Sequence, residues 1–303
     1  MRIGSSDIGY PHLLVAGLLT AMLLGVGVGA STSGTAYGAF NSAWDGGSAL
    51  RDVATDAETE TSIVYNTTEY DEATESETIA FVISPTNGYT DAEAARLESF
   101  VRAGGTLVVA DDFRLHSNAL LERIGASARI DQTPLRDDRH QYKTGALPVA
   151  TRVESSPVTR DVDQLSLNHP TTVSPNGSTV LVRSSNFSYL DRDDDATLDD
   201  DETLDSYPIV TIEQVGAGEV IVVSDPSLFI NSMVERPDNR AFADALVGSH
   251  ETLLLDYSNV DERPPLQVAL NTIRSSPFFQ FVAGGVALSA LVAVARFGRN
   301  ELD

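Results

Sequence analysis

The 303-residue chain contains no cysteine. This absence excludes disulfide bonds, thiolate zinc sites, a lipid-modified N-terminal cysteine and any cysteine nucleophile. Histidine is also scarce, and the five histidines include no pair four residues apart, so the sequence does not predict a zinc site built from them. Because secreted proteins need not contain disulfides, the lack of cysteine does not define a cellular compartment.

Lysine is almost absent as well. Lys143 is the only lysine among 20 basic residues, which face 44 acidic residues and give a net charge of -24. Such a surface suits a protein that stays hydrated in concentrated salt, where long-range repulsion between like charges is screened. We therefore expect a halophilic, haloarchaeal protein. The excess of acid disfavours nucleic acid as a partner, since that binding depends on neutralising phosphates.

Several sequence motifs of catalysis are missing. The chain has no G-x-S-x-G nucleophile elbow, and Lys143 lacks the preceding glycines of a phosphate-binding loop. The sequence "GAGEV" carries two glycines of a turn and is no dinucleotide fingerprint. A Ser–His–Asp triad stays open at this point, because triads are defined by their arrangement in space.

Two uncharged hydrophobic stretches, residues 11–30 and 278–295, are long enough to span a bilayer. Arginines flank both on their terminal sides, which predicts two cytoplasmic ends and a main domain outside the cell membrane. The first stretch also fits a cleaved signal peptide. The predicted organisation is an anchor or signal segment at 1–35, an extracytoplasmic α/β domain at 36–260, a juxtamembrane linker at 261–276, and a transmembrane helix with a short tail at 277–303.

Between these stretches, strand and helix patterns alternate. Apolar runs at 61–66, 78–85 and 106–113 predict buried strands, with helices at 89–105 and 117–127 between and after them. The later elements are predicted as a strand at 178–185, a hairpin at 208–225, a helix at 238–248 capped by Asp238 or Asn239, and a strand at 252–258. Residues 128–177 should be irregular, with one short strand pair. The alternation predicts a parallel sheet covered by helices.

Three segments together resemble the domain-of-unknown-function family 4350. They are "AFVISPTNGYTDAEAARLESFVRAGGTLVVADDF", "SSNFSYLDRDDDATLDDDETLDSYPIV" and "GAGEVIVVSDPSLFINSMVERPDNRAFADALV". The resemblance covers residues 40–258 and implies a fold like that of class I glutamine amidotransferases. This is a flavodoxin-like, mostly parallel sheet with helices on both faces, flanked by N- and C-terminal transmembrane helices. It also implies a MoxR-type ATPase as a possible member of a partner complex.

In such folds ligands bind beyond the C-terminal ends of the strands. The ligand-binding candidates that fall there are Thr86, Asp111, Asp112, Asp225, Ser227 and Asn231. An alternative for the aspartates and the serine is turn and cap chemistry, in which they bind nearby backbone N–H groups. For Asn231 the alternative is hydrogen bonding to backbone groups across its loop. The absence of cysteine excludes cysteine-dependent glutaminase activity, and no residue is assigned a catalytic role.

The stretch "DRDDDATLDDDE", residues 191–202, has the spacing of a calcium-binding loop. Side chains or carbonyls at alternate positions supply the oxygens that this hard cation prefers. The predicted ligands are Asp191, Asp193, Asp195, Thr197, Asp199 and Glu202. Ala196 departs from the pattern, because glycine normally makes the sharp turn there. The alternative is a solvated acidic loop without a metal.

These observations predict a membrane-anchored, non-enzymatic domain that binds a protein partner or a small ligand. One alternative is a hydrolase or amidase with a non-cysteine site near Asp111, Asp112, Asp225 and Ser227. Another is an accessory subunit of a membrane transport or assembly complex. Calcium is the only cofactor that the sequence predicts.

Overall fold

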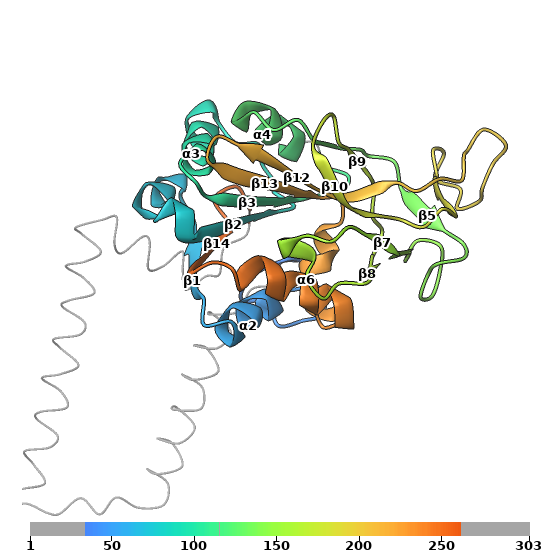
Figure 1. Ribbon diagram of the computed structural model, residues 1–303, viewed down its shortest axis with the longest axis horizontal. Helices are drawn as coiled ribbons and strands as arrows, with labels where there is room; N and C mark the ends of the chain where they lie inside the picture. Colours follow the sequence, from blue (N-terminus) through green and yellow to red (C-terminus); the bar gives the residue numbers. More distant parts are fainter. Residues whose placement is uncertain (1–33, 115, 262–303) are drawn as a thin grey trace, which may run out of the picture. The chain divides into compact units, whose positions relative to one another are not determined.

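An eight-stranded sheet organises the described residues, 34–114 and 116–261, of the computed structural model (Figure 1). Five strands on one side run parallel, in the order β1 (Glu60–Val64), β14 (Thr252–Asp256), β2 (Thr78–Ile83), β3 (Thr106–Ala110) and β13 (Gly218–Val223). The sheet continues with three antiparallel neighbours, β12 (Pro208–Val215), β10 (Thr179–Arg183) and β7 (Arg152–Val153). The sheet is therefore mixed.

Helices cover both faces of the sheet, because its central strands are apolar along their whole length (Figure 1). The helices α3 (Asp91–Arg102) and α4 (His116–Ile124) pack on one face, where Leu97 and Leu121 are buried. The helices α2 (Ser48–Asp56) and α6 (Pro237–Val247) pack on the other face, together with the short α5 (Asn231–Val234).

The N-terminus of α3 follows its sequence signature closely. Thr90 accepts a hydrogen bond from the backbone N–H of Glu93, and the Glu93 carboxylate accepts from the backbone N–H of Thr90. This capping box satisfies two N–H groups that an uncapped helix would leave unpaired.

Short elements fill the connections between the larger ones. The four 3₁₀-helices of the described residues are η1 (Thr67–Glu72), η2 (Glu75–Glu77), η3 (Pro157–Thr159) and η4 (Pro226–Phe229). Three two-stranded ribbons pair β4 (Arg129–Ile130) with β9 (Val173–Ser174), β5 (Leu135–Asp137) with β11 (Ser188–Leu190), and β6 (Val149–Ala150) with β8 (Leu165–Ser166). Residues 128–177 thus contain more strands than the single short pair that the sequence predicts.

The structure contradicts the predicted flavodoxin-like, mostly parallel sheet and the amidotransferase-like fold that the resemblance implies. The physical reason lies in the hairpin of β12 and β13, which turns at Gly216 with a φ of 68°. A two-residue hairpin forces its strands to run antiparallel, and β10 and β7 continue the antiparallel pairing beyond β12. Parallel pairing is confined to β1, β14, β2, β3 and the β3-facing side of β13.

The expectation of flanking transmembrane helices and of a location at the cell membrane is also corrected. Within residues 34–114 and 116–261, no helix is long and apolar enough to cross a bilayer. The two stretches for which spans were predicted, 11–30 and 278–295, lie outside the described residues, as do most of the predicted anchor segment and linker.

The predicted cap of α6 is wrong in detail. Neither Asp238 nor Asn239 caps the helix, since Arg236 occupies the N-cap position without a side-chain hydrogen bond. The buried Asn239 side chain instead bonds the backbone N–H and carbonyl of Ser166 in β8. The Asn239 side chain thus makes a tertiary contact in place of the helix cap that the local sequence pattern predicted.

Candidate functional site

The predicted ligand residues come from the C-terminal ends of β2, β3 and β13, which are neighbours in the sheet. The ends of the parallel strands meet at one edge, so the turns that follow them lie together. The backbone N–H of Ser84 donates to Ala110 over 2.8 Å, and that of Asp111 donates to Val223 over 3.1 Å. These bonds continue the sheet pairing into the turns and hold the site residues in place.

Asp111 is fully buried behind the turn that follows β3. Its carboxylate accepts hydrogen bonds from the Ser117 hydroxyl in α4 at 2.5 Å and from the backbone N–H of Asp112 at 3.0 Å. Burial raises the pKa of Asp111 to about 6, and these two bonds offset part of the rise. Asp111 therefore links the end of β3 to the first turn of α4 and has no face open to a ligand.

Asp225 is the corresponding buried carboxylate after β13. Its two oxygens accept from the backbone N–H groups of Asn168 at 2.7 Å and Ser227 at 2.9 Å. Burial raises the pKa of Asp225 to about 7, against the lowering effect of both bonds. Asp225 thereby caps η4 and fixes residue 168 of the long connection against the sheet edge.

Tyr37 is part of this cluster, although no sequence pattern marks it. Its hydroxyl interacts with the Ser227 side chain, and its pKa is raised above the usual range, mainly by burial and then by Asp112. Tyr37 lies in a loop before α2 with a φ of 61°, and only the tertiary fold brings it beside β3 and β13. Nothing local in the sequence could have identified it.

Two other predicted residues hold loops together. The Thr86 hydroxyl donates to the Asn259 carbonyl at 3.2 Å and accepts from the Asp261 backbone N–H at 2.9 Å. Asn231 clamps the loop before α2: its oxygen accepts from the Ala49 N–H at 2.7 Å, and its amide nitrogen donates to the Asn41 and Ala43 carbonyls. Both side chains position the backbone, and for Asn231 this is the alternative role that the sequence indicates.

Asp112 differs from its neighbours because it is only half buried. One of its oxygens accepts from the Phe113 backbone N–H at 2.6 Å. Burial raises its pKa, and nearby Arg114 and His169 act in the opposite direction. Asp112 thus lies between the buried carboxylates and the surface.

An open cavity of about 220 Å³ is lined by Phe113, the residue that follows Asp112 in the chain, and by seven residues from other segments. Its apolar wall consists of Phe113, Pro134, Leu135, Ala146 and Pro170, and its polar wall consists of Arg136, His169 and Asp194. The Phe113 side chain is 41% exposed, so its ring is accessible to a ligand in the cavity. No local pattern in the sequence marks these residues as a group, because they come from five separate segments of the chain.

The buried aspartates frame this cavity without entering it. Asp111 bonds the N–H of Asp112, directly before Phe113, and Asp225 bonds the N–H of Asn168, directly before His169. The buried Thr171, which follows the lining residue Pro170, is held to the sheet because its N–H donates to the Ser224 carbonyl over 3.0 Å. The predicted ligand residues are therefore positioning residues one step behind the surface that a ligand can reach.

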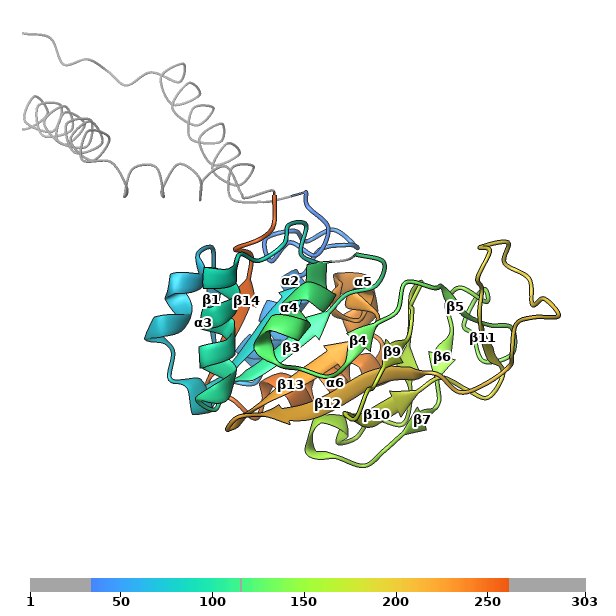
Figure 2. The same cartoon turned by 90° about the horizontal axis from the view of Figure 1, so that it is seen from above.

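The predicted calcium loop connects β11 to β12 and projects from one end of the domain in both views (Figures 1 and 2). The carboxylates of Asp191, Asp193 and Asp195 each place an oxygen within 4.8 Å of the others. Asp191 is buried, and its oxygens also accept from the backbone N–H groups of Asp195 and Ala196. Three of the six predicted ligands are therefore gathered.

The remaining predicted ligands lie in the same loop but make other contacts. Thr197 donates its backbone N–H and its hydroxyl to Asp195. The Glu202 carboxylate accepts from the backbone N–H of Arg192 at 2.7 Å and that of Asp199 at 3.3 Å. Glu202 closes the loop in this arrangement and does not join the three aspartates.

Ala196 makes the turn at which glycine was expected. Its φ is 67°, in the left-handed region that side chains with a Cβ adopt at a cost of about 1–2 kcal/mol. The loop thus has the backbone reversal that its spacing requires, without glycine.

Arg136 connects the loop to the cavity. Its Nε donates to the buried Asp191 and a terminal nitrogen lies 3.2 Å from Asp194, while the same residue lines the cavity wall. The guanidinium is therefore already paired with two carboxylates.

Similarity to solved structures is weak. The mmIFT52 N-terminal domain is 14% identical with a TM-score of 0.46, over 60% of this chain and 78% of that one. A polyextremophilic β-galactosidase from the Antarctic haloarchaeon Halorubrum lacusprofundi is 16% identical with a TM-score of 0.34, over 56% of this chain and 22% of that one. A cytoplasmic protein from Salmonella typhimurium LT2 is 10% identical with a TM-score of 0.42, over 71% and 85%. At these values none carries a functional argument.

Among curated proteins, a sequence search finds no match. The sequence pattern of the family described as "Domain of unknown function (DUF4350)" does match, over residues 39–247. This region contains the sheet edge, the cavity and the acidic loop. The chain therefore belongs to the DUF4350 family.

Proposed function

We propose that this domain is a non-enzymatic binding module whose contact site is the cavity between Phe113 and Arg136. The observation that carries the proposal is the contrast, at this edge of the sheet, between buried carboxylates and an accessible cavity. Asp111 and Asp225 are buried and occupied by hydrogen bonds, while the cavity next to them is open and mostly apolar. Buried carboxylates of this kind stabilise loops and cannot reach a substrate.

The size of the cavity indicates what it can accept. A closed apolar cavity of about 150 Å³ holds one benzene molecule, whereas sites for larger small molecules are typically about 300–1,000 Å³. A volume of about 220 Å³ therefore suits a single ring, either a small aromatic ligand or an aromatic side chain of a protein partner. Phe113 offers the ring against which it would stack.

The hydrolase alternative has less support. The Ser227 hydroxyl interacts with Tyr37, and its N–H is held by Asp225, so the serine is occupied on both sides. The one Ser–His side-chain bond described, between Ser249 and His250 at 3.1 Å, lies at the start of β14, at the opposite edge of the sheet. His250 Nδ1 also lies 2.9 Å from the Leu246 carbonyl, so this nitrogen carries the proton and cannot act as a base for Ser249.

Two further features are kept as proposals. A structural calcium ion in the acidic loop is supported by the gathered Asp191, Asp193 and Asp195 and by the turn at Ala196. A halophilic source is supported by the charge of -24 and the single lysine. A protein partner could include the MoxR-type ATPase that the family resemblance implies.

The cavity is tested with phenol as a one-ring probe, using ligand-observed NMR on the full chain in concentrated salt. We expect saturation transfer to phenol in the wild type. Phe113→Ala removes the stacking surface, and Ala146→Leu fills the cavity. Each substitution should weaken phenol binding at least fivefold. Trp44→Ala is the matched control, because it removes an exposed aromatic side chain that does not line the cavity. Equal binding by all four proteins, or no binding by the wild type, would rule out the proposed site.

A further inference from the structure

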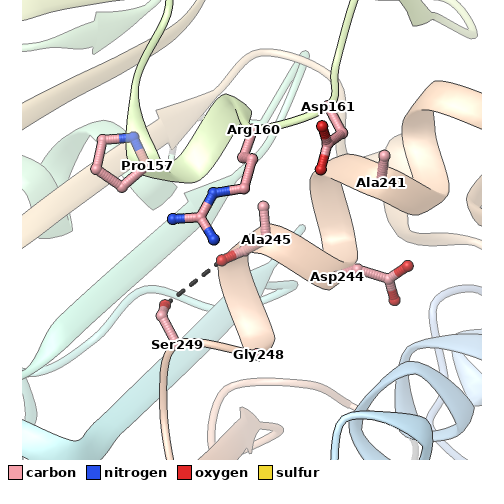
Figure 3. A pocket seen from close by; sticks show the side chains of 8 residues that line it. All are labelled: Pro157, Arg160, Asp161, Ala241, Asp244, Ala245, Gly248 and Ser249. Carbon is pink, nitrogen blue, oxygen red and sulfur yellow. Dashed lines mark hydrogen bonds between the residues drawn. The ribbon is translucent and has the colours of Figure 1, made fainter.

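A second cavity lies on the α6 side of the sheet. Its volume is about 430 Å³, and it lies between the segment around η3 and the C-terminal half of α6 (Figure 3). The helix ends at Val247 and β14 begins at Thr252, so this end of α6 lies beside the N-terminal ends of the parallel strands. The cavity is therefore at the opposite edge of the sheet from Asp111 and Asp225.

Small residues keep the floor of this cavity open. Ala241, Ala245 and Gly248 follow one another at intervals of four and three residues, which places them on the same face of α6. Pro157 forms the facing wall (Figure 3). Larger side chains at these positions would fill the space that now separates the helix from the segment above it.

Two adjacent residues of opposite charge face this space. The Arg160 guanidinium and the Asp161 carboxylate both point from the upper segment towards α6 (Figure 3). Asp161 has a φ of 61°, a left-handed backbone conformation that is uncommon for residues other than glycine. Neither side chain forms an ion pair with any described residue, and they do not pair with each other.

Asp244, the third charged residue at the cavity, does have an ion-pair partner. Asp244 is held by Arg240 at 2.9 Å, and Arg240 also pairs with Asp56 at 2.7 Å. The charges at the cavity without an ion-pair partner among the described residues are thus one cation and one anion, both directed at the same volume. A ligand with only a negative charge would meet Asp161 and Asp244, and a ligand with only a positive charge would meet Arg160.

We propose that this cavity binds a small zwitterion of the α-amino-acid class. Its carboxylate would pair with Arg160, and its ammonium group would pair with Asp161. The remaining volume over Ala245 accommodates a small side chain. This site shares no lining residue with the cavity at Phe113, so the two proposals stand or fall separately.

L-alanine is the test ligand, compared with N-acetyl-L-alanine, which keeps only the carboxylate, and L-alaninamide, which keeps only the ammonium group. Binding to the full chain is followed by NMR at one fixed salt concentration. We expect L-alanine to bind at least tenfold more tightly than either analogue. Comparable affinities for the three compounds, or no binding of L-alanine up to 50 mM (about the weakest range that such a titration resolves), would overturn the proposal.

Variants assign the binding to this cavity. Arg160→Ala and Asp161→Ala should each weaken L-alanine binding at least fivefold, and Ala245→Leu should block it by filling the floor. Arg114→Ala is the control, since it removes an exposed arginine that does not line the cavity. Thermal unfolding of each variant shows whether it is folded. Unchanged binding in folded Arg160→Ala or Asp161→Ala protein would contradict the assignment.

Discussion

Replacing Asp225 by asparagine tests the structural role of the buried carboxylates. In the native protein both oxygens accept backbone N–H groups, from Asn168 and Ser227. Asparagine keeps one acceptor but places an NH₂ group against the other N–H, so one bond is lost and two donors face each other. Leaving a buried donor without a partner costs about 1–3 kcal/mol.

The stability that Asp225 contributes should depend on pH, and the direction of that dependence follows from its pKa. Burial raises the pKa of Asp225 to about 7, whereas an unfolded aspartate has a pKa of about 3.9. Between these values the native state holds a proton that the unfolded state has released. The associated stability is therefore fully present below about pH 4 and is lost as the pH rises towards 7. Between pH 5 and pH 8 the free energy of unfolding of the native protein should fall by about 2–3 kcal/mol because of this group alone.

The amide that replaces the carboxyl group has no proton to release, so the stability of the variant should lack this component. We expect Asp225→Asn to be destabilising at pH 5 and to be about 2–3 kcal/mol less destabilising at pH 8. Urea unfolding of the full chain at both pH values, in the same salt, measures the difference. Asp163→Asn is the control, because Asp163 is exposed and its replacement should have the same small effect at both pH values. A destabilisation by Asp225→Asn that is equal at the two pH values, or larger at pH 8, would refute the reasoning.

Three other predictions concern the loops. Asn231→Ala should lower the free energy of unfolding by about 2–4 kcal/mol, measured by urea denaturation, because it leaves the N–H of Ala49 and two carbonyls without their partner. Calcium should raise the melting temperature of the wild type, and Asp193→Asn, which removes one of the three gathered carboxylates, should reduce that shift in calorimetry; identical shifts in both proteins would argue against a loop site. Ala196→Gly relieves the left-handed strain at this turn but makes the unfolded chain more flexible. Because these two effects oppose each other, the melting temperature should stay equal or rise, and a marked drop would contradict the role assigned to this turn.

Local sequence patterns were sufficient for the elements with strong periodicity or clear caps. The capping box of Thr90 and Glu93 marks the start of α3, and the glycine at 216 marks the hairpin of β12 and β13. The same patterns do not report strand direction beyond a hairpin, so the antiparallel pairing of β10 and β7 next to the predicted hairpin was missed. Asn239 shows that a local pattern can also be overridden by a distant contact. Its side chain was predicted to cap a helix, but it bonds the backbone of Ser166 in β8.

The sequence led to the edge of the sheet where the candidate site lies, but not to the residues that line its cavity. The rule that ligands bind beyond the C-terminal ends of parallel strands led to Asp111, Asp112 and Asp225, and the structure does bring these residues to one edge. Whether a side chain then points outward or inward depends on packing that no local pattern encodes. Phe113 and His169 form the accessible surface because the buried aspartates hold the backbone immediately before them.

The measurement that tests the central claim most directly is an NMR titration of the full chain with phenyl acetate, which follows binding and hydrolysis in one sample. The ester carries the single ring that the cavity at Phe113 suits and the bond that a hydrolase would cleave. We predict saturable binding that phenol displaces and that Phe113→Ala weakens, with phenol released no faster than in buffer alone. Protein-dependent hydrolysis that disappears in Asp112→Asn or Ser227→Ala would contradict the account and identify the sheet edge as an active site.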